Sequence, residues 1–256
     1  MKTVILCGGL GTRLSEETDL RPKPMVEIGD MPVLCHILHM YSAQGFNDFV
    51  LALGYKASYI KDYFLKYPFL YNDYSIDMTR NTTQLQPSKI LNWKMDLLDT
   101  GKNTMTGGRI ARLKPYLENQ TFMLTYGDGV GDVDLNELLR FHRSHGKLVT
   151  VTAVRPKGRF GMMRCVEDMV TSFQEKGHHP EEWINAGFFI MEPEVLRYIK
   201  GDDTELEREV LVQLAEMGQL MAYRHEGFWA CMDTLRDKQE LELLWKEGNA
   251  PWKVWD

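Results

Sequence analysis

Residues 6–14 read Leu-Cys-Gly-Gly-Leu-Gly-Thr-Arg-Leu, and residues 21–27 continue Arg-Pro-Lys-Pro-Met-Val-Glu. The first run follows an apolar stretch, Thr3 to Cys7, that predicts a buried β-strand. Glycines at the turn from a strand toward a helix let main-chain N–H groups approach a polyphosphate, and Arg13 and Lys23 add positive charge nearby. The sequence therefore predicts a phosphate-binding loop at the end of the first strand.

This loop matches neither of the two common phosphate-binding motifs. A P-loop ends in Gly-Lys-Ser/Thr, which is absent here, and Leu14 occupies the third glycine position of the dinucleotide fingerprint. The alternative interpretation is a tight strand-to-helix turn that carries a basic pair on the surface.

Composition narrows the function classes. With 256 residues and 44% hydrophobic content, the chain can bury a substantial core. A net charge of −6 argues against a nucleic-acid partner, because duplex binding depends on cationic contacts to phosphate. Without an apolar run of about 18 residues or a charged-then-apolar leader, we expect a cytoplasmic protein with no membrane partner. The four cysteines are scattered and predict reduced core residues rather than a zinc site.

The first half of the chain alternates strand patterns with amphipathic helix patterns. The predicted strands are Thr3 to Cys7, Asp48 to Leu53, Thr121 to Thr125 and Leu148 to Val154, and the predicted helices are Met31 to Gln44, Ala57 to Lys66 and Asp134 to His145. This alternation predicts an α/β fold with a Rossmann-like mixed, mostly parallel sheet and helices on both faces. Ligands of such sheets bind beyond the carboxyl ends of the strands, where the glycine loop and the turn after Thr125 are both expected.

Two other parts of the chain differ from this pattern. Between Tyr67 and Gly108 polar residues interrupt the periodicity, and several apolar residues have no obvious partner in a parallel sheet: Ile90, Leu91, Trp93, Met95, Leu97 and Leu98. We interpret this stretch as an interface arm. After Pro156 the expected elements are shorter: strands at Met162 to Val166, Val170 to Gln174, Ile184 to Met191 and Leu220 to His225, and helices from Pro193, Glu205 to Met217 and Thr234 to Lys246. We expect one domain over 1–256, with a substrate-binding part from about 151 to 256.

Two aspartates stand at turns that could meet at the ligand edge of the sheet. Tyr126-Gly127-Asp128-Gly129 ends a predicted strand, and Met232-Asp233-Thr234 precedes a predicted helix. Asp-Gly is ordinarily a hairpin signal and an aspartate before a helix is ordinarily an N-cap. Together with the glycine loop, however, they offer the two hard oxygen ligands that Mg²⁺ on a phosphate substrate requires.

The glycine run and Asp128 with Asp233 resemble the signature of the nucleoside-triphosphate:sugar-1-phosphate nucleotidyltransferases. The resemblance narrows to the glucose-1-phosphate cytidylyltransferase branch through motifs spread over almost the whole chain: Asp99-Thr100-Gly101, Met105 to Arg109, Thr125 to Gly129, Gly158 to Gly161, Ser172 to Lys176, Asn185 to Phe189, Met232 to Asp237 and Ala250 to Lys253. The glycine run and the motif Met232 to Asp237 are shared across the family. The motifs between them and the tail, Ala250 to Lys253, are more specific to this branch.

The resemblance implies a glycosyltransferase-A-like fold with a nucleotide-binding half of about 1–150 and a sugar-binding part of about 151–256. It implies that a sugar 1-phosphate oxygen attacks the α-phosphorus of CTP, giving CDP-glucose for deoxyhexoses of surface polysaccharide, with Mg²⁺ as cofactor. The implied catalytic residues are Arg13, Lys23, Asp128 and Asp233, of which the two aspartates bind the metal. The implied nucleotide-binding residues are Leu6, Cys7, Gly8, Gly9, Leu10, Gly11, Thr12, Arg13, Lys23, Thr104, Arg109 and Gly127, and the implied sugar-phosphate residues are Glu175, Lys176, Asn185 and Gly187. The partners would be CTP, a sugar 1-phosphate and further copies of the chain, as a hexamer.

Alternatives remain at this stage. Gly177 follows Glu175-Lys176 where the family usually has proline, which relaxes a backbone constraint beside the sugar site. The base could be uracil or thymine and the sugar another hexose. A non-catalytic sugar-nucleotide sensor is the rival from another class, although it would not need the aspartate pair. An assembly protein that acts through Trp252 and Trp255 is the third alternative.

Overall fold

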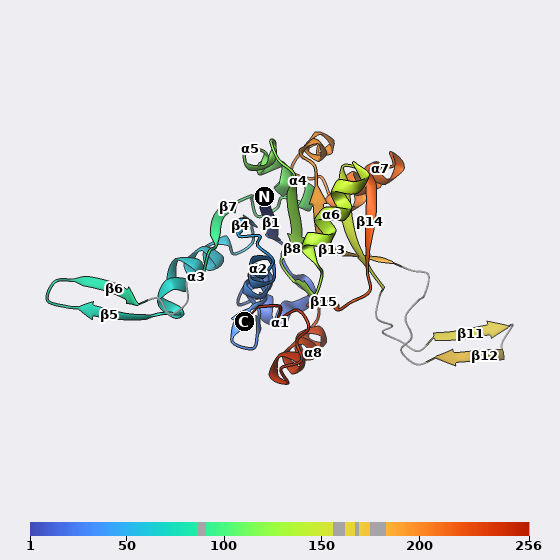
Figure 1. Cartoon of the computed structure of the whole chain (residues 1–256). Helices are drawn as coiled ribbons and strands as arrows, with labels where there is room; N and C mark the ends of the chain where they lie inside the picture. Colours follow the sequence, from blue (N-terminus) through green and yellow to red (C-terminus); the bar gives the residue numbers. More distant parts are fainter. Residues whose placement is uncertain (87–90, 156–161, 167–168, 175–182, 256) are drawn as a thin grey trace.

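The computed structural model describes residues 1–86, 91–155, 162–166, 169–174 and 183–255. A seven-stranded sheet lies at its centre, in the order β14-β10-β13-β8-β1-β4-β7 (Figure 1). Its strands are β1 (Lys2–Cys7), β4 (Asp48–Leu53), β7 (Lys94–Asp99), β8 (Phe122–Tyr126), β10 (Val149–Val154), β13 (Ile184–Met191) and β14 (Leu220–His225). The pairs β1·β4, β1·β8, β4·β7 and β10·β14 are parallel, and β13 runs antiparallel to β8 and β10.

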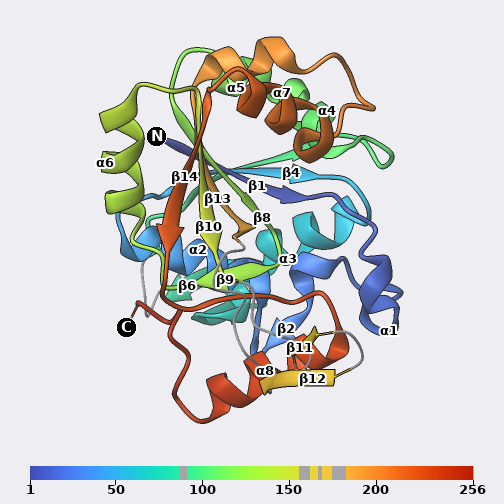
Figure 2. The ribbon, with the colours of Figure 1, turned by 90° about the vertical axis from the view of Figure 1, so that its right-hand side faces the viewer.

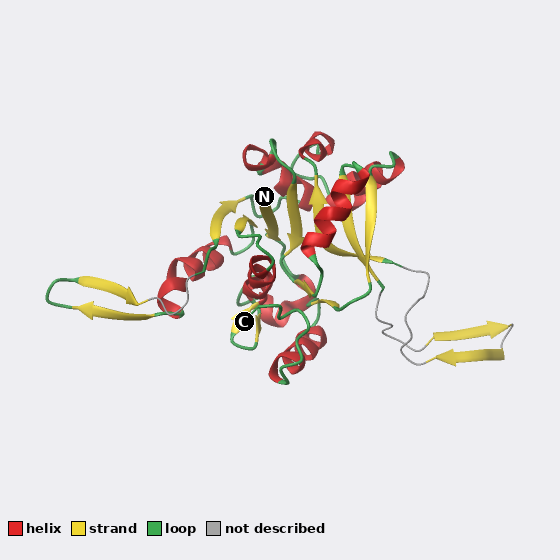
Figure 3. Ribbon diagram, viewed as in Figure 1, coloured by secondary structure: helices red, strands yellow, loops and turns green. Residues whose placement is uncertain are grey.

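Helices pack around this sheet, and of the short pairs of strands some lie beside it while others project from the body (Figure 3). The α-helices are α1 (Ser15–Thr18), α2 (Val33–Ala43), α3 (Ala57–Leu70), α4 (Thr106–Arg112), α5 (Lys114–Leu117), α6 (Leu135–His145), α7 (Leu211–Glu216) and α8 (Leu235–Lys246). Tighter or wider helical turns form η1 (Thr12–Leu14), η2 (Lys23–Met25), η3 (Pro193–Tyr198) and η4 (Leu206–Val210). The small antiparallel pairs are β2 (Glu27–Ile28) with β3 (Met31–Pro32), β5 (Asp73–Asp77) with β6 (Thr82–Gln86), β9 (Gly129–Gly131) with β15 (Trp229–Cys231), and β11 (Met162–Val166) with β12 (Met169–Gln174). Within the described residues, none of the helices combines the length and apolar character needed to cross a bilayer.

The two faces of the sheet bury separate cores. Along β1, Ile5 and Cys7 join one apolar cluster while Val4 and Leu6 join the other, as the two-residue period of a strand requires. The first cluster is closed by α2, α3, α6 and α8, and the second by α4, α5, α7 and their flanking turns. Figure 2 shows α4, α5 and α7 together on one side of the sheet and α2 and α3 on the other. The predicted mixed, mostly parallel sheet with helices on both faces is therefore confirmed.

Several predicted elements match the structure to the residue, and others differ for local reasons. The strands predicted at Asp48 to Leu53, Ile184 to Met191 and Leu220 to His225 are β4, β13 and β14. The single helix expected from Glu205 is instead a π-helical turn, η4, followed by α7, and the helix expected from Pro193 is a 3₁₀ turn. The helix predicted at Asp134 to His145 is α6, and Asp134 caps it by accepting from the main-chain nitrogens of Asn136 and Glu137 at 2.9 and 2.8 Å.

The stretch from Tyr67 to Gly108 corrects one prediction. Met95, Leu97 and Leu98 do have a partner in the parallel sheet, because Lys94–Asp99 forms β7, the parallel edge strand beside β4, whereas Ile90 lies outside the described residues. Trp93 packs against the core, with its ring 6.3 Å from that of Phe49. The first part does project: α3 and the β5/β6 ribbon extend away from the body (Figure 1).

The C-terminal segment folds back onto α2 through a group of aromatic rings, here called the aromatic clasp: His36, Trp245, Trp252 and Trp255. His36 and Trp252 are fully buried. The centroid of the His36 ring lies 4.6 Å from that of Trp245 and 5.8 Å from that of Trp255. The indole nitrogen of Trp252 donates to Nδ1 of His36 at 3.2 Å, and Nε2 of His36 lies 2.9 Å from the Ile28 carbonyl. These contacts require a neutral imidazole that carries its proton on Nε2.

Candidate active site

The glycine loop lies at the carboxyl end of β1, as predicted. Leu6 and Cys7 are buried at the end of the strand, and the loop beyond them opens outward, with Leu10 52% exposed. A Cβ on Gly9 would meet nothing within 4 Å. Gly11 has a φ of +67°, and a Cβ there would lie 2.7 Å from the Thr18 side chain, so this position requires glycine. The exposed main chain of the loop is therefore free to face a ligand.

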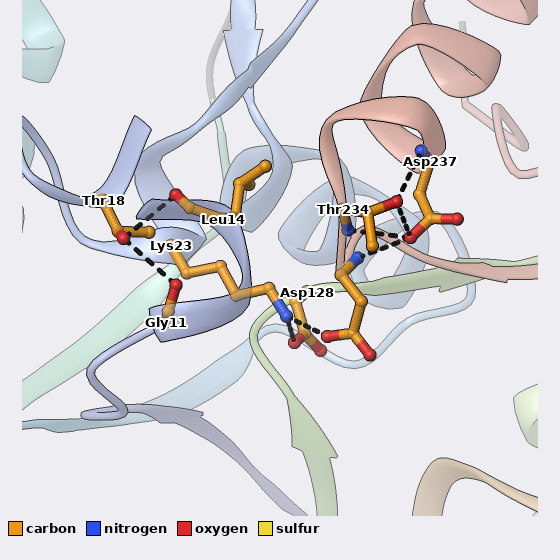
Figure 4. Close-up of polar contacts among 8 residues, drawn as sticks. Gly11, Leu14, Thr18, Lys23, Asp128, Thr234 and Asp237 are labelled. Atoms are coloured by element: carbon orange, nitrogen blue, oxygen red, sulfur yellow. Dashed lines mark hydrogen bonds and ion pairs between the residues drawn. The ribbon is translucent and has the colours of Figure 1, made fainter. Parts of the chain in front are cut away.

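Thr18 holds the far side of this loop. Its hydroxyl lies 3.1 Å from the Gly11 carbonyl and 3.0 Å from the Leu14 carbonyl (Figure 4). Thr12 is exposed in η1, and of Arg13 only the main chain in η1 is described. Thr18 thus holds the carbonyls of Gly11 and Leu14 in place, while Gly9 and Leu10 of the loop stay exposed.

Lys23 reaches from η2 to both predicted metal-binding aspartates. Its ammonium lies 2.6 Å from Oδ2 of Asp128 and also contacts Oδ1 of Asp233 (Figure 4). Pro22 and Pro24 flank it and fix the backbone of the turn. Burial alone would lower the pKa of Lys23, but the charge of Asp128 and the hydrogen bonds to both carboxylates outweigh it, so the pKa is raised. The side chain is therefore a permanent cation here.

A small antiparallel pair brings the two aspartates together. β9 begins directly after Asp128 and pairs with β15, which ends two residues before Asp233. The main-chain nitrogen of Met232 donates to the Asp128 carbonyl at 3.0 Å and extends this pairing. The aspartates lie 105 positions apart along the chain, so backbone pairing, and not their charges, sets their proximity.

Asp233 is not the N-cap of α8. Thr234 takes that position in a capping box with Asp237, whose carboxylate accepts from the main-chain nitrogens of Asp233 and Thr234 at 3.1 and 2.8 Å. The carboxylate of Asp233 therefore points toward Lys23 and Asp128.

Cys231 is the third potential ligand at this point. One ligand atom each from Asp128, Cys231 and Asp233 lies within 4.8 Å of the others. Burial, followed by the charge of Asp128, raises the pKa of the Cys231 thiol, so this group stays protonated and is a poor ligand. The donor set is then two carboxylates, which suits a hard divalent cation. The cysteines were predicted to be core residues. Cys7 and Cys35 are buried as predicted, whereas Cys231 is only half-buried and lies beside the two aspartates.

The buried side chain of Arg109 lies under the glycine loop and makes several hydrogen bonds there. Its guanidinium donates to the carbonyls of Gly8, Leu53 and Gly101 at 2.9, 3.1 and 2.7 Å, and to the Thr100 hydroxyl at 2.8 Å. These acceptors follow or end β1, β4 and β7, so one side chain joins three strand ends. A Cβ on Gly8 would lie 2.2 Å from the guanidinium carbon, and one on Gly54 would lie 2.4 Å from Nη1. Both glycines are needed because the guanidinium fills that space.

Thr104 and Gly127 border the same region. Thr104 is 8% exposed, and a Cβ on Gly101 would lie 2.6 Å from its hydroxyl. Gly127 donates from its main-chain nitrogen to the Leu6 carbonyl at 3.1 Å, and a Cβ there would lie 2.9 Å from Pro24. Gly127 therefore lets the turn before Asp128 pack against the base of the glycine loop.

The predicted sugar-side residues are only partly described. Asn185 and Gly187 lie on β13, which pairs with β8 next to the Asp128 turn, and the Asn185 side chain is exposed. Glu175 and Lys176 lie outside the described residues, as does Gly177.

Sequence comparison agrees with this arrangement. The family model described as nucleotidyl transferase matches residues 2–234. The chain belongs to the nucleotidyl transferase family. It is 49% identical to a glucose-1-phosphate cytidylyltransferase of Salmonella typhi and 42% identical to a probable glucose-1-phosphate cytidylyltransferase of Bacillus subtilis (strain 168), in both cases over the full length of both chains. Among solved structures, HddC from Yersinia pseudotuberculosis superposes with a TM-score of 0.69 at 26% identity, covering 95% of this chain and 99% of that one.

Sequence reasoning missed several residues of this nucleotidyltransferase site. Gly54 directly follows a predicted strand, so the rule that ligands bind at carboxyl strand ends could have found it. Tyr126 stood inside a quoted motif without a role of its own. Thr18 and Glu207 match no motif, because their importance depends on side-chain contacts, with Gly11 seven residues earlier and with the distant Tyr126.

Proposed function

We propose that this nucleotidyltransferase moves a cytidylyl group from CTP to α-D-glucose 1-phosphate and releases CDP-glucose and pyrophosphate. The observation that carries the proposal is the full-length identity to glucose-1-phosphate cytidylyltransferases, together with the meeting of Lys23, Asp128 and Asp233 at the glycine loop. The reaction belongs to the cytoplasm, and its product is a precursor of CDP-linked deoxyhexoses for surface polysaccharide.

The chemistry is an in-line displacement at the α-phosphorus. A phosphate oxygen of the sugar 1-phosphate forms the new P–O bond, and the bond to the β-phosphate oxygen breaks with its electron pair leaving on pyrophosphate. Such transfers depend on positioning and charge neutralisation more than on an acid or base. Lys23 suits this role because its raised pKa keeps the ammonium charged while it draws two anionic phosphates together. The glycine loop and Arg13 hold the β- and γ-phosphates.

Asp128 and Asp233 fit a magnesium site. Their oxygens already share one cation, the Lys23 ammonium, and Mg²⁺ takes only one or two protein carboxylates while keeping several waters. When bound, Mg²⁺ supplies electrostatic stabilisation of the charge that develops on the phosphates. The carboxylates hold this cation in place, and β9 and β15 keep the two side chains together.

The remaining predicted contacts divide between the two substrates. Gly8 to Thr12, Thr104, Arg109 and Gly127 form the nucleotide side, with Arg109 acting from beneath the loop. Glu175, Lys176, Asn185 and Gly187 form the sugar side. In this proposal the nucleotide half extends to about residue 150 and the sugar-binding part comprises the remainder.

We also propose that the protein is a homo-oligomer, a hexamer by its resemblance to the cytidylyltransferase branch. An isolated two-stranded ribbon is at best marginally stable in water, yet β5/β6 projects from the body (Figure 1). Its surroundings expose large apolar side chains: Leu65, Phe69, Leu70, Tyr74, Ile76 and Met78. Because Trp93 is partly buried and packs against the core, Ile76→Asp is the better test of assembly. It should lower the mass measured by light scattering and raise the KM for CTP, whereas Met217→Asp, at the exposed C-cap of α7, should do neither. A monomeric wild-type protein would refute this part.

One turnover panel tests the reaction itself. Purified protein is given each of four nucleoside triphosphates with glucose 1-phosphate and other hexose 1-phosphates, with and without Mg²⁺, and pyrophosphate release is measured. We expect CTP with glucose 1-phosphate to give the highest kcat/KM and a chelator to abolish turnover. Equal or faster turnover with UTP or dTTP would refute the base assignment, and no turnover with any pair would favour a sugar-nucleotide sensor.

A further inference from the structure

A hydrogen-bonded relay connects three separate elements beside the Asp128 turn. The hydroxyl of Tyr126, the last residue of β8, donates to Oε1 of Glu207 at 2.6 Å. Nδ2 of Asn185 donates to the same hydroxyl at 3.2 Å, and Oδ1 of Asn185 accepts from the main-chain nitrogen of Gly187 at 2.8 Å. The relay therefore runs from Glu207 through Tyr126 to the exposed amide of Asn185.

The polarity of these bonds allows only one orientation of the Asn185 amide. A tyrosine hydroxyl has one proton, and Tyr126 gives it to an acceptor-only carboxylate, so the hydroxyl can only accept from Asn185. The Gly187 nitrogen can only donate, so it must face Oδ1. Burial, with the charge of Glu207, raises the pKa of Tyr126 and keeps that proton on the phenol.

Glu207 is itself held from a second direction. Its other oxygen, Oε2, accepts from the Thr106 hydroxyl at 2.7 Å, and that hydroxyl accepts from the Leu206 nitrogen at 2.9 Å. Glu207 lies in the π-helical turn η4, a conformation found frequently at functional sites. Helix α4 packs closely against the segment before η4, because a Cβ on Gly108 would lie 2.4 Å from the Asp202 carbonyl oxygen. The Thr106-Gly107-Gly108 motif thus places Glu207 against Tyr126.

A strained bulge in β13 supports the other end of the relay. Gly187 and Phe188 have φ angles of +79° and +47°, and the register with β10 shifts between Val151 and Ala153. A positive φ is costly for a phenylalanine and persists only where the surroundings impose it. Phe188 is fully buried, and its carbonyl accepts from the Thr152 hydroxyl at 2.9 Å. Bulges near active sites commonly redirect a side chain, which here is that of Asn185.

We infer that Tyr126 and Glu207 are positioning residues for the sugar 1-phosphate, acting through the fixed amide of Asn185. This inference rests on the proposed function, because it assigns the substrate that Asn185 faces. After its two internal bonds, Asn185 retains one N–H and one lone pair of Oδ1. One donor beside one acceptor is the pattern that binds a sugar hydroxyl, which can accept and donate at once. The nucleotide loop is held by a separate set of contacts, those of Arg109 with the carbonyls of Gly8, Leu53 and Gly101, so we expect the relay to affect the sugar side alone.

The test compares variants of the relay by steady-state kinetics, using the nucleotide and sugar pair that the wild-type protein turns over best. Tyr126→Phe keeps the ring that packs against Gly187 and removes only the hydroxyl. We expect it to raise the KM for the sugar 1-phosphate about tenfold and to leave the KM for the nucleotide within about twofold. Tyr223→Phe on β14 removes a matched hydroxyl outside the site and should leave both KM values unchanged.

Variants of Glu207 separate positioning from simple structural damage. Glu207→Ala should reproduce the sugar KM of Tyr126→Phe. Glu207→Gln should restore it, because its amide oxygen can still accept from Tyr126 while its NH2 group donates to the second lone pair of the Thr106 hydroxyl. An unchanged sugar KM in Tyr126→Phe would overturn the inference, as would equal rises in both KM values or failure of Glu207→Gln to restore the sugar KM. These outcomes leave wild-type turnover intact, whereas a wild-type protein that turns over no pair would refute the proposed function and this role with it.

Discussion

The charged triad of Lys23, Asp128 and Asp233 and the aromatic clasp around His36 do the same structural task with opposite chemistry. Each joins segments far apart in sequence: Lys23 contacts residues 105 and 210 positions away, and His36 bonds to Trp252 at 216 positions. The triad is charged and partly exposed, with 12 to 25% of each side chain accessible. The clasp is neutral, and both His36 and Trp252 are fully buried.

This difference separates function from stability. In the proposed function the triad binds anionic substrates, which requires water-accessible charge. The two aspartates are brought together by β9 and β15 rather than by their charges. The clasp buries apolar surface against the core, and the burial of apolar surface is the main favourable term in folding. We therefore expect changes in the triad to remove activity and spare stability, and changes in the clasp to have the reverse effect.

The largest expected effect is on activity. Asp128→Asn and Asp233→Asn should each lower kcat by about a thousandfold at saturating Mg²⁺, because each removes a charged ligand worth several kcal/mol of charge stabilisation. The melting temperature should change little, since neither substitution alters core volume. Asp134→Asn is the matched control, because asparagine caps a helix as well as aspartate does. A near-normal kcat in either site variant would remove that aspartate from the metal site.

The next effect is on stability. Trp252→Ala should lower the free energy of unfolding by about 3 kcal/mol, because it removes a fully buried ring from beside His36 and Phe228. The kcat should stay within about twofold of wild type. Denaturant titration measures the loss, and Val254→Ala, on a 44% exposed side chain of the same tail, serves as control. A large loss of kcat with unchanged stability would assign the tail to the active site.

Arg109 combines properties of the two regions: its side chain is buried, as in the clasp, and charged, as in the triad. Arg109→Lys should raise the KM for CTP about thirtyfold, near 2 kcal/mol, because one ammonium cannot reach the carbonyls of Gly8, Leu53 and Gly101 together. Arg112→Lys, on the same helix and paired with Asp202 at the surface, should change this KM little. A lower melting temperature with an unchanged KM would place Arg109 with the clasp.

Sequence patterns predicted six of the seven strands of the central sheet and the members of the triad, but not the contacts that hold the triad together. β4, β13 and β14 follow from local apolar patterns, and Asp128 and Asp233 follow from their positions at turns. The three-residue strands β9 and β15 are too short to leave a pattern, although they bring the aspartates together. β7 was missed because Lys94, Asp96 and Asp99 interrupt its apolar residues, as suits an edge strand. Glu207 was missed because its partners lie on α4 and β8.

The smallest expected effect concerns the clasp alone and appears only as a dependence on pH. Burial lowers the pKa of His36 from 6.5 to about 4. Because the folded-state pKa is the lower one, the stabilisation is complete above pH 6.5 and is lost as the pH falls toward 4. The wild-type protein should therefore lose about 1 kcal/mol of unfolding free energy through His36 between pH 7.5 and 5.5. His36→Gln, which can still donate to Ile28 and accept from Trp252 but does not titrate, should be less stable at pH 7.5 and should lack this part of the slope. Urea titrations of both proteins at the two pH values measure the difference. Equal slopes would mean that His36 titrates alike in the folded and unfolded chain, and the clasp would then owe its stability to packing alone.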